Sequence, residues 1–248
     1  MSQHRIVIEP GSLNRNYWRD FWQYRGLLFF LAWRDVKVRY KQTAIGVLWS
    51  VIRPAITIGA MWFIGWLFGS MSSGAAPRIL VVCAAVLPWQ FFASAFSETA
   101  NSLITNSNLL TKVYFPRMIV PVSAVVVSII DLAISLIIFT VLALYYAWWP
   151  GVQVALLPLF LFIAIFTSFG IGVLIAALNV KYRDFRYLIP VMVQFGLYLS
   201  PVAFTSQDIL AHPSISSWMV YVYYLNPMAG VIDGFRYCLL GDHYPLFT

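Results

Sequence analysis

The amino-acid sequence predicts an all-α integral membrane protein, on the basis of its composition and the lengths of its apolar runs. Of its 248 residues, 61% are hydrophobic and only 10% are charged, and the mean hydropathy is +0.79. Typical soluble domains are about 45–50% apolar and about 25% charged. So few charges cannot cover the surface of a water-soluble protein, whereas they suit a surface that lipid solvates. The composition therefore excludes a soluble globule and a disordered chain.

Five apolar runs are long enough to cross a bilayer, whose hydrocarbon core of about 30 Å needs about 20 apolar residues in a helix. They lie at 51–71, 79–100, 118–149, 154–178 and 187–204. Two further runs, 217–225 and 228–240, are too short to cross, and Asn226-Pro227 separates them. We therefore expect a single transmembrane domain over 1–248, made of a cytoplasmic N-terminal part (1–50), five spans (51–204) and an outer region of re-entrant helices (205–248).

Basic residues give the predicted orientation. Most of the 16 Lys and Arg residues lie before the first predicted span and in the loops after the second and fourth spans. Cytoplasmic loops of membrane proteins carry such an excess, so the N-terminus is predicted to be cytoplasmic.

Two segments on this side are predicted to be surface helices. In 18–41, aromatic and basic residues recur at helical spacing, which predicts an amphipathic helix in the cytoplasmic interface. It either anchors the chain at the membrane surface or, as its many charges favour, also receives a cytoplasmic partner at its basic end. The polar loop 98–117 also carries apolar side chains at roughly helical spacing, which predicts a short helix with a docking surface.

Asp131 is the one carboxylate well inside a predicted span. An ionisable residue at that depth is a functional candidate by default. It has no second acid, His or Lys at helical spacing, so a hydrogen bond between helices is favoured over a proton relay.

The sequence contains no motif for catalysis or nucleotide binding. Gly-x-x-x-x-Gly-Lys-Ser/Thr, His-Glu-x-x-His and Gly-x-Ser-x-Gly do not occur, and the three histidines are scattered through polar segments. Cys83 and Cys238 form no metal-binding pattern and are interpreted as packing residues. Although the formal net charge is +7, no basic stripe on a polar fold predicts nucleic-acid binding. We expect a chain that is not an enzyme and that holds no cofactor or metal of its own.

Six ordered segments carry a resemblance to a known family. They are RDVKVRYKQTAIGVLWSVIRP (34–54), VLPWQFF (86–92), NSNLLTKVYFPR (106–117), NVKYRDF (179–185), YLSPVAF (198–204) and NPMAGVIDGFRYCLL (226–240). Together they resemble the signatures of ABC-2 type exporter permeases, specifically the branch that exports O-antigen, capsule and teichoic acid chains. The match covers roughly residues 18–241.

The resemblance implies the transmembrane domain of a type V exporter in a bacterial inner membrane. Such a permease works as a homodimer with two copies of a cytoplasmic ATP-binding cassette ATPase, which binds ATP and Mg, and it moves lipid-linked polysaccharide. Members of the family carry a sixth span, which would begin where this sequence ends. We therefore expect that span to be absent from this chain.

The resemblance also implies roles for three groups of cytoplasmic residues. The cytoplasmic gate would be formed by Arg34, Asp35, Arg39, Tyr40 and Lys41. A coupling helix seated in the ATPase would contain Asn106, Asn108, Leu109 and Lys112. A second ATPase contact would be made by Lys181, Tyr182, Arg183 and Asp184.

Aromatic residues make up 17% of the chain, more than interfacial belts alone require. Aromatic faces offer apolar contact to sugar CH groups, and Tyr hydroxyls exchange hydrogen bonds, so a wall of such residues would let a polymer slide. The candidates for channel and substrate contacts are Trp62, Trp89, Phe92, Tyr198, Ser200, Tyr224, Asn226 and Arg236. Core packing or contact with lipid is an equally good interpretation of each aromatic residue.

Three other functions remain as alternatives. Within the same family, the substrate would be a small lipid or a drug. An ion-coupled secondary carrier would need several ionisable groups inside the membrane and inverted repeats. A membrane-bound transferase would need clustered acid–base or metal-binding residues, for which the outer candidates are Asp208, Asp233, Asp242 and His243.

Overall fold

The computed structural model describes residues 17–41, 47–67, 76–206 and 217–241. The regular elements in these ranges are all helices. Four helices are long and apolar enough to cross a membrane: α3 (Val47–Leu67), α4 (Arg78–Thr105), α6 (Ile119–Tyr145) and α7 (Leu157–Lys181). The short 3-10 helix η1 (Val152–Leu156) directly precedes α7. The chain is therefore an all-α, multi-pass membrane protein.

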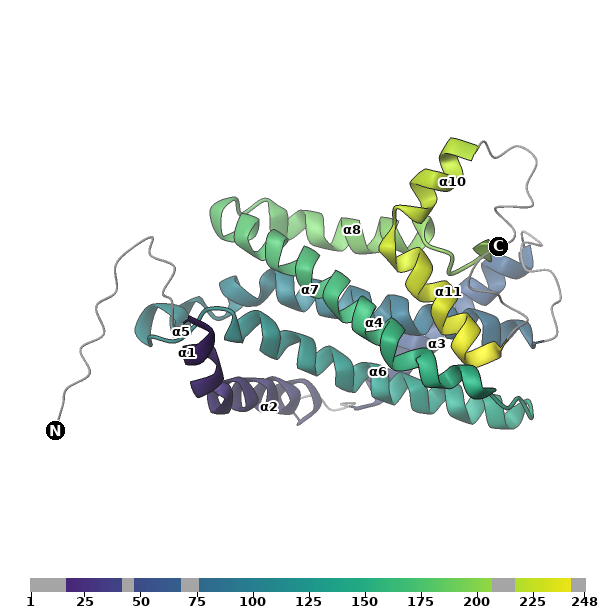
Figure 1. The fold of residues 1–248 in the computed structure, drawn as a ribbon, viewed down its shortest axis with the longest axis horizontal. Coiled ribbons are helices and arrows are strands. Elements are labelled where there is room, and N and C mark those ends of the chain that lie inside the picture. Colours follow the sequence, from purple (N-terminus) through teal and green to yellow (C-terminus); the bar gives the residue numbers. More distant parts are fainter. Residues whose placement is uncertain (1–16, 42–46, 68–75, 207–216, 242–248) are drawn as a thin grey trace.

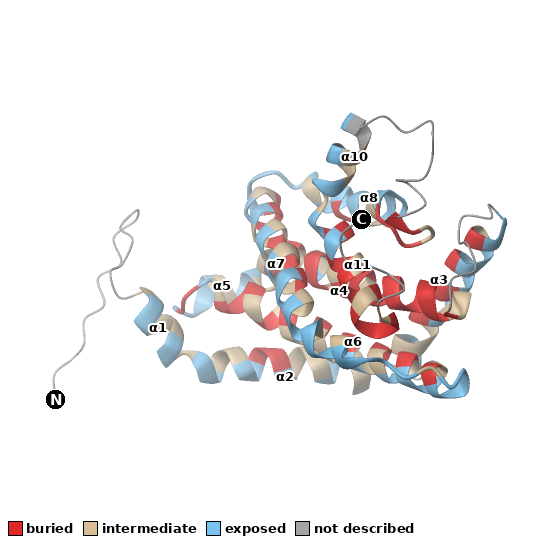
Figure 2. Cartoon of the chain, turned by 45° about the vertical axis from the view of Figure 1, so that its right-hand side comes forward, coloured by how far each residue is buried: buried red, intermediate tan, exposed pale blue. Residues whose placement is uncertain are grey.

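Helix α4 lies at the centre of the bundle (Figure 1). It packs against α3, α6, α7, α8 (Phe185–Leu199) and α11 (Pro227–Leu240). Every residue from Leu80 to Leu87 is buried, and α4 and α11 carry much of the red, buried surface in Figure 2. A helix that is apolar around its whole circumference is expected where other helices cover all of its sides.

The fifth predicted span corresponds to the shorter helix α8, which has 15 residues. At 1.5 Å per residue this helix is about 22 Å long, less than the hydrocarbon thickness of about 30 Å. It ends at Leu199 because Ser200 precedes Pro201 and takes an extended conformation (φ −100°, ψ 153°), which proline imposes on its predecessor. The total of five spans stays a prediction.

The C-terminal region contains two short helices, α10 (Ser217–Tyr224) and α11, as the sequence predicts. Asn226 begins α11, because its side-chain oxygen accepts a hydrogen bond from the Met228 amide at 3.0 Å. Pro227 occupies the first turn, where its missing N–H costs nothing. Gly241, with φ +82°, follows the last turn and ends the helix.

The N-terminal segment 18–41 differs from the single predicted helix. It forms α1 (Tyr17–Gln23) and α2 (Arg25–Lys41), with a turn at Tyr24 between them. Leu31 and Ala32 of α2 are buried, and α2 lies along the first half of α6 (Figure 1). Of the aromatic residues that recur at helical spacing in this segment, Tyr40 is half-buried, whereas the others are exposed: Trp18, Trp22, Phe29 and Trp33.

A small core, separate from the main bundle, holds this region together. Its buried residues are Leu31 of α2 and Phe115, Ile119 and Val120 around the start of α6. Partly buried apolar residues of α1, α2 and α5 (Ser107–Lys112) complete it. The small core thus joins four elements at one end of the molecule, which we call the α5 end.

Candidate functional site

The predicted coupling segment forms helix α5 at the α5 end of the bundle (Figure 1). Asn106 is the one residue between α4 and α5. Its side-chain amide donates to the Ser102 carbonyl at 3.0 Å, and its side-chain oxygen accepts from Arg34 Nη2 at 2.9 Å. Asn106 is therefore a fixed corner that connects α4, α5 and α2.

Helix α5 has a polar exposed side and an apolar anchored side. Asn108 and Lys112 are exposed, whereas Leu109 and Leu110 are partly buried in the small core. This arrangement leaves polar groups available to a partner while the apolar side chains hold the helix to the protein. Whether a partner binds there stays a prediction.

Two predicted groups meet at Arg34, since this gate candidate binds the coupling candidate Asn106. Arg34 also pairs with its neighbour Asp35 at 2.7 Å. Helix α2 ends at Lys41, and the side chain of this last gate candidate lies outside the described part of the structure.

The other two gate candidates, Arg39 and Tyr40, contact the acid inside α6. Arg39 Nη1 lies 2.6 Å from Asp131 Oδ2, and Arg39 Nη2 lies 3.1 Å from Glu98 Oε1 on α4. The Tyr40 hydroxyl donates to Asp131 Oδ1. These four residues, which we call the Asp131 network, tie the C-terminal end of α2 to both α4 and α6.

Tyr40 keeps its proton in this network. Burial of its ring, together with the hydrogen bond and charge of Asp131, raises the pKa of the Tyr40 hydroxyl above its usual range. A neutral hydroxyl can donate to the carboxylate, so Asp131 receives hydrogen bonds from two consecutive residues of α2. The sequence identified Asp131 as a candidate but not its partners, which lie about ninety residues earlier in the chain.

Helix α4 makes further polar contacts with α6 and α7, on either side of Glu98 along the helix. These contacts were not identified from the sequence. Ser128 of α6 donates to Ser94 of α4 at 3.1 Å, and the buried Asn179 of α7 donates to the Ala100 carbonyl at 3.3 Å. Ser94, Glu98 and Asn101 follow one another at steps of four and three, which places them on one face of α4. This helical period in an otherwise apolar segment was the available signal.

The second predicted ATPase contact lies in the turn between α7 and α8, at the same end as α5 (Figure 1). Lys181, Tyr182, Arg183 and Asp184 are all exposed. The Lys181 ammonium stands over the Tyr182 ring, 5.0 Å from its centroid. Asp184 begins α8, and its carbonyl accepts from the Tyr187 amide at 3.0 Å.

Arg236, a predicted substrate contact, is buried, with 1% of its surface exposed. Its guanidinium donates to the carbonyl oxygens of Phe204 (3.0 Å), Val202 (3.5 Å) and Val81 (3.5 Å). It also pairs with Asp233 at 3.6 Å. In a single chain, Arg236 therefore connects α11 to α4 and to residues 202–204, and its burial favours a packing role.

Asp233 is bound from its other side as well. Ser206 donates to Asp233 Oδ2 and lies 3.0 Å from the Tyr223 hydroxyl of α10. We call Ser206, Tyr223, Asp233 and Arg236 the Arg236 network. Of the alternative transferase candidates, Asp233 is thus engaged in packing, while Asp208, Asp242 and His243 lie outside the described residues.

Two other pairs of predicted channel residues are brought together. Asn226 donates to the buried Ser200 hydroxyl at 3.0 Å. Trp89 and Phe92 are neighbours on α4, with ring centroids 5.3 Å apart. Trp89 is buried and packs over Gly196 of α8.

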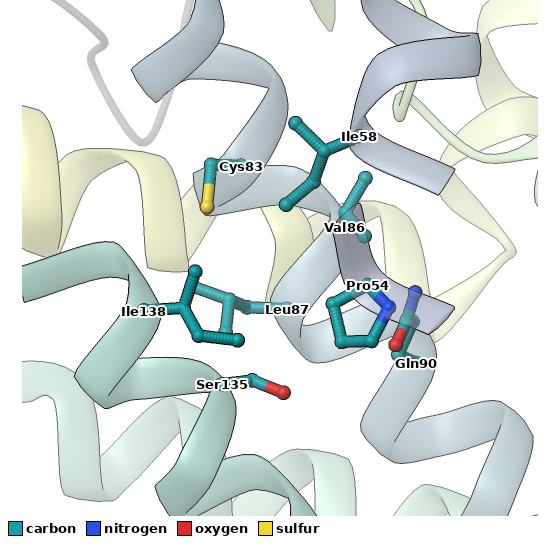
Figure 3. Close-up of a pocket in the computed structure, with 8 residues that line it drawn as sticks. All are labelled: Pro54, Ile58, Cys83, Val86, Leu87, Gln90, Ser135 and Ile138. Carbon is teal, nitrogen blue, oxygen red and sulfur yellow. The ribbon is translucent and has the colours of Figure 1, made fainter. Parts of the chain in front are cut away.

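The remaining channel candidates, Trp62, Tyr198 and Tyr224, are exposed on three different helices. Their roles in the channel stay predictions. A narrow crevice between α3, α4 and α6 contains none of the candidates (Figure 3); it is lined by Pro54, Ile58, Cys83, Val86, Leu87, Gln90, Ser135 and Ile138.

Comparison with known proteins gives a consistent result. The model of the ABC-2 type transporter family matches residues 26–240, from the second residue of α2 to the last residue of α11. The O-antigen export system permease protein RfbA of Myxococcus xanthus is 27% identical over 218 residues, which are 88% of this chain and 82% of that protein. Two proteins of the same name from Klebsiella pneumoniae are 28% and 26% identical over 212 residues, which are 85% of this chain and 78% of each relative.

Proposed function

Because this chain belongs to the family of ABC-2 type transporters, we propose that it is the membrane-spanning permease subunit of an ATP-driven polysaccharide exporter. The observation that carries the proposal is that the three relatives share one name and align with most of this chain. Three O-antigen export permeases align with at least 85% of this chain. The proposed substrate is a lipid-linked polysaccharide of the O-antigen type, and the proposed site is a bacterial inner membrane with the N-terminus in the cytoplasm.

ATP hydrolysis would be supplied by a separate subunit. The sequence has no Gly-x-x-x-x-Gly-Lys-Ser/Thr segment of its own, so two copies of an ATP-binding cassette ATPase would bind ATP and Mg beneath two copies of this chain. The exposed side of α5 and the turn 181–184 are the proposed docking surfaces. Their exposure and their common position at the α5 end support this assignment.

The geometry of Asn106 suggests how movement of the ATPase would reach the membrane helices. A displacement of α5 acts directly on α4 through Asn106, and on α2 through the Arg34–Asn106 hydrogen bond. Since α4 contacts most of the other helices, it is well placed to pass that displacement on. The polysaccharide would then move along a path between the two copies, in contact with exposed aromatic side chains.

Co-purification with a candidate ATP-binding cassette ATPase from the same organism tests the assignment of partner. Lys112→Glu, together with Asn108→Asp, places negative charge on the exposed side of α5 and is expected to reduce ATPase binding at least tenfold. Arg19→Glu together with Gln23→Glu on α1 is the matched control, because it makes the same change of charge on two exposed residues outside α5. Equal loss of binding in both variants would argue against a docking surface on α5.

Export in reconstituted vesicles tests the assignment of substrate. The complex is expected to move fluorescently labelled, lipid-linked O-antigen only with ATP and only when the Walker lysine of the ATPase is intact. Transport of short-chain lipids or dyes without polysaccharide would instead support the small-lipid or drug alternative. Transport by this chain without any ATPase would overturn the proposal.

A further inference from the structure

Helix α2 is held to the rest of the protein by contacts of two different kinds. Its first half, which includes Leu27, Leu28 and Leu31, packs into the small core. Its second half is held through polar contacts of Arg34, Arg39 and Tyr40 with α4, α6 and the corner at Asn106. The apolar contacts therefore hold the N-terminal half of α2 in place, and the polar contacts hold its C-terminal half.

The central residue of the polar contacts is Asp131. Its two carboxylate oxygens bind different residues of α2: Oδ2 receives the Arg39 guanidinium at 2.6 Å, and Oδ1 receives the Tyr40 hydroxyl. Arg39 then reaches Glu98 with its second terminal nitrogen. Because a guanidinium presents its donors in a rigid fork, one Arg can hold two helices at a set spacing, which a Lys ammonium cannot.

The contacts of the Asp131 network are partly open to their surroundings. The side chains of Arg39, Asp131 and Glu98 are 28%, 24% and 50% exposed. An ionisable side chain inside a membrane span is costly and marks a functional contact. Both carboxylate oxygens of Asp131 bind residues of α2, so the contact that explains its position is the one that orients α2.

We propose that Asp131 is a positioning residue that sets the end of α2, so that α2 links the Asn106 corner to the interior of α4 and α6. This inference rests on the proposed function and deepens it. A displacement of Asn106 moves α2 through Arg34, and the rigid helix then moves Arg39, five residues further along, against Asp131 and Glu98. Without Asp131 the described contacts of Arg39 and Tyr40 with α4 and α6 are reduced to the one between Arg39 and Glu98, and ATP hydrolysis no longer drives export efficiently.

Hydrogen exchange measured by mass spectrometry on the complex in lipid nanodiscs tests the structural half of the proposal. In Asp131→Asn, backbone amides of residues 36–41 are expected to exchange about tenfold faster, as loss of a charge-assisted contact predicts, while those of 25–31 stay unchanged. Asp20→Asn, a carboxylate on α1 outside the network, is the control. Equal acceleration across the whole of α2, or none at all, would overturn the proposal.

Coupling measurements test the functional half. Asp131→Asn is expected to bind the ATPase normally but to consume several times more ATP for each polysaccharide exported. Arg39→Gln should have the same effect, and the double variant should be no worse than either single one, because the two residues act through one contact. Asp131→Glu should recover most of the coupling. Additive losses, or unchanged coupling in Asp131→Asn, would refute the role of Asp131.

The exchange experiment does not depend on the substrate. If the wild-type complex fails to export polysaccharide, the proposed function is wrong, whereas the position of α2 is still decided by the exchange of residues 36–41.

Discussion

The Asp131 network and the Arg236 network are both centred on an arginine, but they are built differently. Arg236 is 1% exposed and is surrounded mainly by backbone carbonyl oxygens, with Asp233 three residues away on the same helix. Arg39 keeps 28% of its side chain exposed and binds only side chains, which come from two other helices. One arginine is enclosed by the fold, and the other bridges separate elements.

This difference indicates which part of the molecule is rigid and which part can move. A buried cation bound to backbone oxygens cannot leave without exposing several desolvated acceptors, so its partners stay together. The Asp131 network joins its helices through side chains alone, which can separate by rotamer changes without unpairing any backbone group. We therefore expect the Arg236 network to be a permanent junction and the Asp131 network to be a reversible one.

The largest expected effect is at Arg236. Arg236→Ala leaves three carbonyl groups without this donor and the Asp233 carboxylate without its charge partner, and it should lower stability by about 3–5 kcal/mol. The measurement is unfolding in mixed micelles with increasing SDS, followed by tryptophan fluorescence. Replacing both charges, with Asp233→Asn and Arg236→Met, should be less harmful than Arg236→Ala alone. If Arg236→Ala lowered the free energy of unfolding less than Arg39→Ala does, the Arg236 network would not be the more rigid of the two.

Close packing next to the Arg236 network gives the second effect. A Cβ added at Gly234 would lie 2.2 Å from the Phe160 ring, whereas one added at Gly230 of the same helix meets nothing within 4 Å. Gly234→Ala should therefore cost about 1–3 kcal/mol, while Gly230→Ala should be neutral or slightly stabilising. The same unfolding assay measures both variants. Equal stability of the two would show that α11 is not tightly packed at Gly234.

At the α5 end, removal of the link between α2 and Asn106 should matter less. Arg34→Ala deletes the hydrogen bond to Asn106 and the ion pair with Asp35, both made by a side chain that is 40% exposed, so it should cost about 1 kcal/mol or less. Its effect should be seen instead as faster hydrogen exchange at residues 104–108. A loss as large as that of Arg236→Ala would mean that this region is as rigid as the other.

The smallest effect is expected at Glu98, which is the most exposed member of the Asp131 network. Glu98→Gln should change stability by less than about 0.5 kcal/mol. The free energy of unfolding of the wild-type protein should also vary little with salt. Salt screens mainly the exposed contact of Arg39 with Glu98, whereas its shorter contact with Asp131 is less exposed. Unfolding of both proteins at low and high salt checks this expectation. A large, salt-dependent loss would assign the main contact of Arg39 to Glu98 rather than to Asp131.

Much of the fold could be predicted because it depends on local sequence. Four of the five predicted spans correspond to long helices, with boundaries that differ by a few residues. Asn226-Pro227 was correctly identified as the boundary between two short helices. The fifth span was harder to define, because the apolar run continues past Ser200 while Pro201 ends the helix.

The candidate site could be predicted only in part. The short helix predicted in the polar loop 98–117 is confirmed as α5, while its role as a coupling helix stays a prediction. The partners of Asp131 could not be found, since ion pairs between distant segments leave no periodic pattern in one sequence. Arg236 was a candidate substrate contact, and its donors are directed at carbonyl groups of its own chain; these partners, too, lie far away in the sequence.

Hydropathy along the chain is enough to predict a membrane protein, the course of its long helices and its polar segments, because each of these follows from the transfer of nearby side chains between water and lipid. Which polar residues meet is decided by the packing of the helices. It placed Arg39 against Asp131 and Glu98, and it enclosed Arg236 among backbone oxygens. Those choices depend on how helices far apart in the chain pack together, which hydropathy alone does not specify.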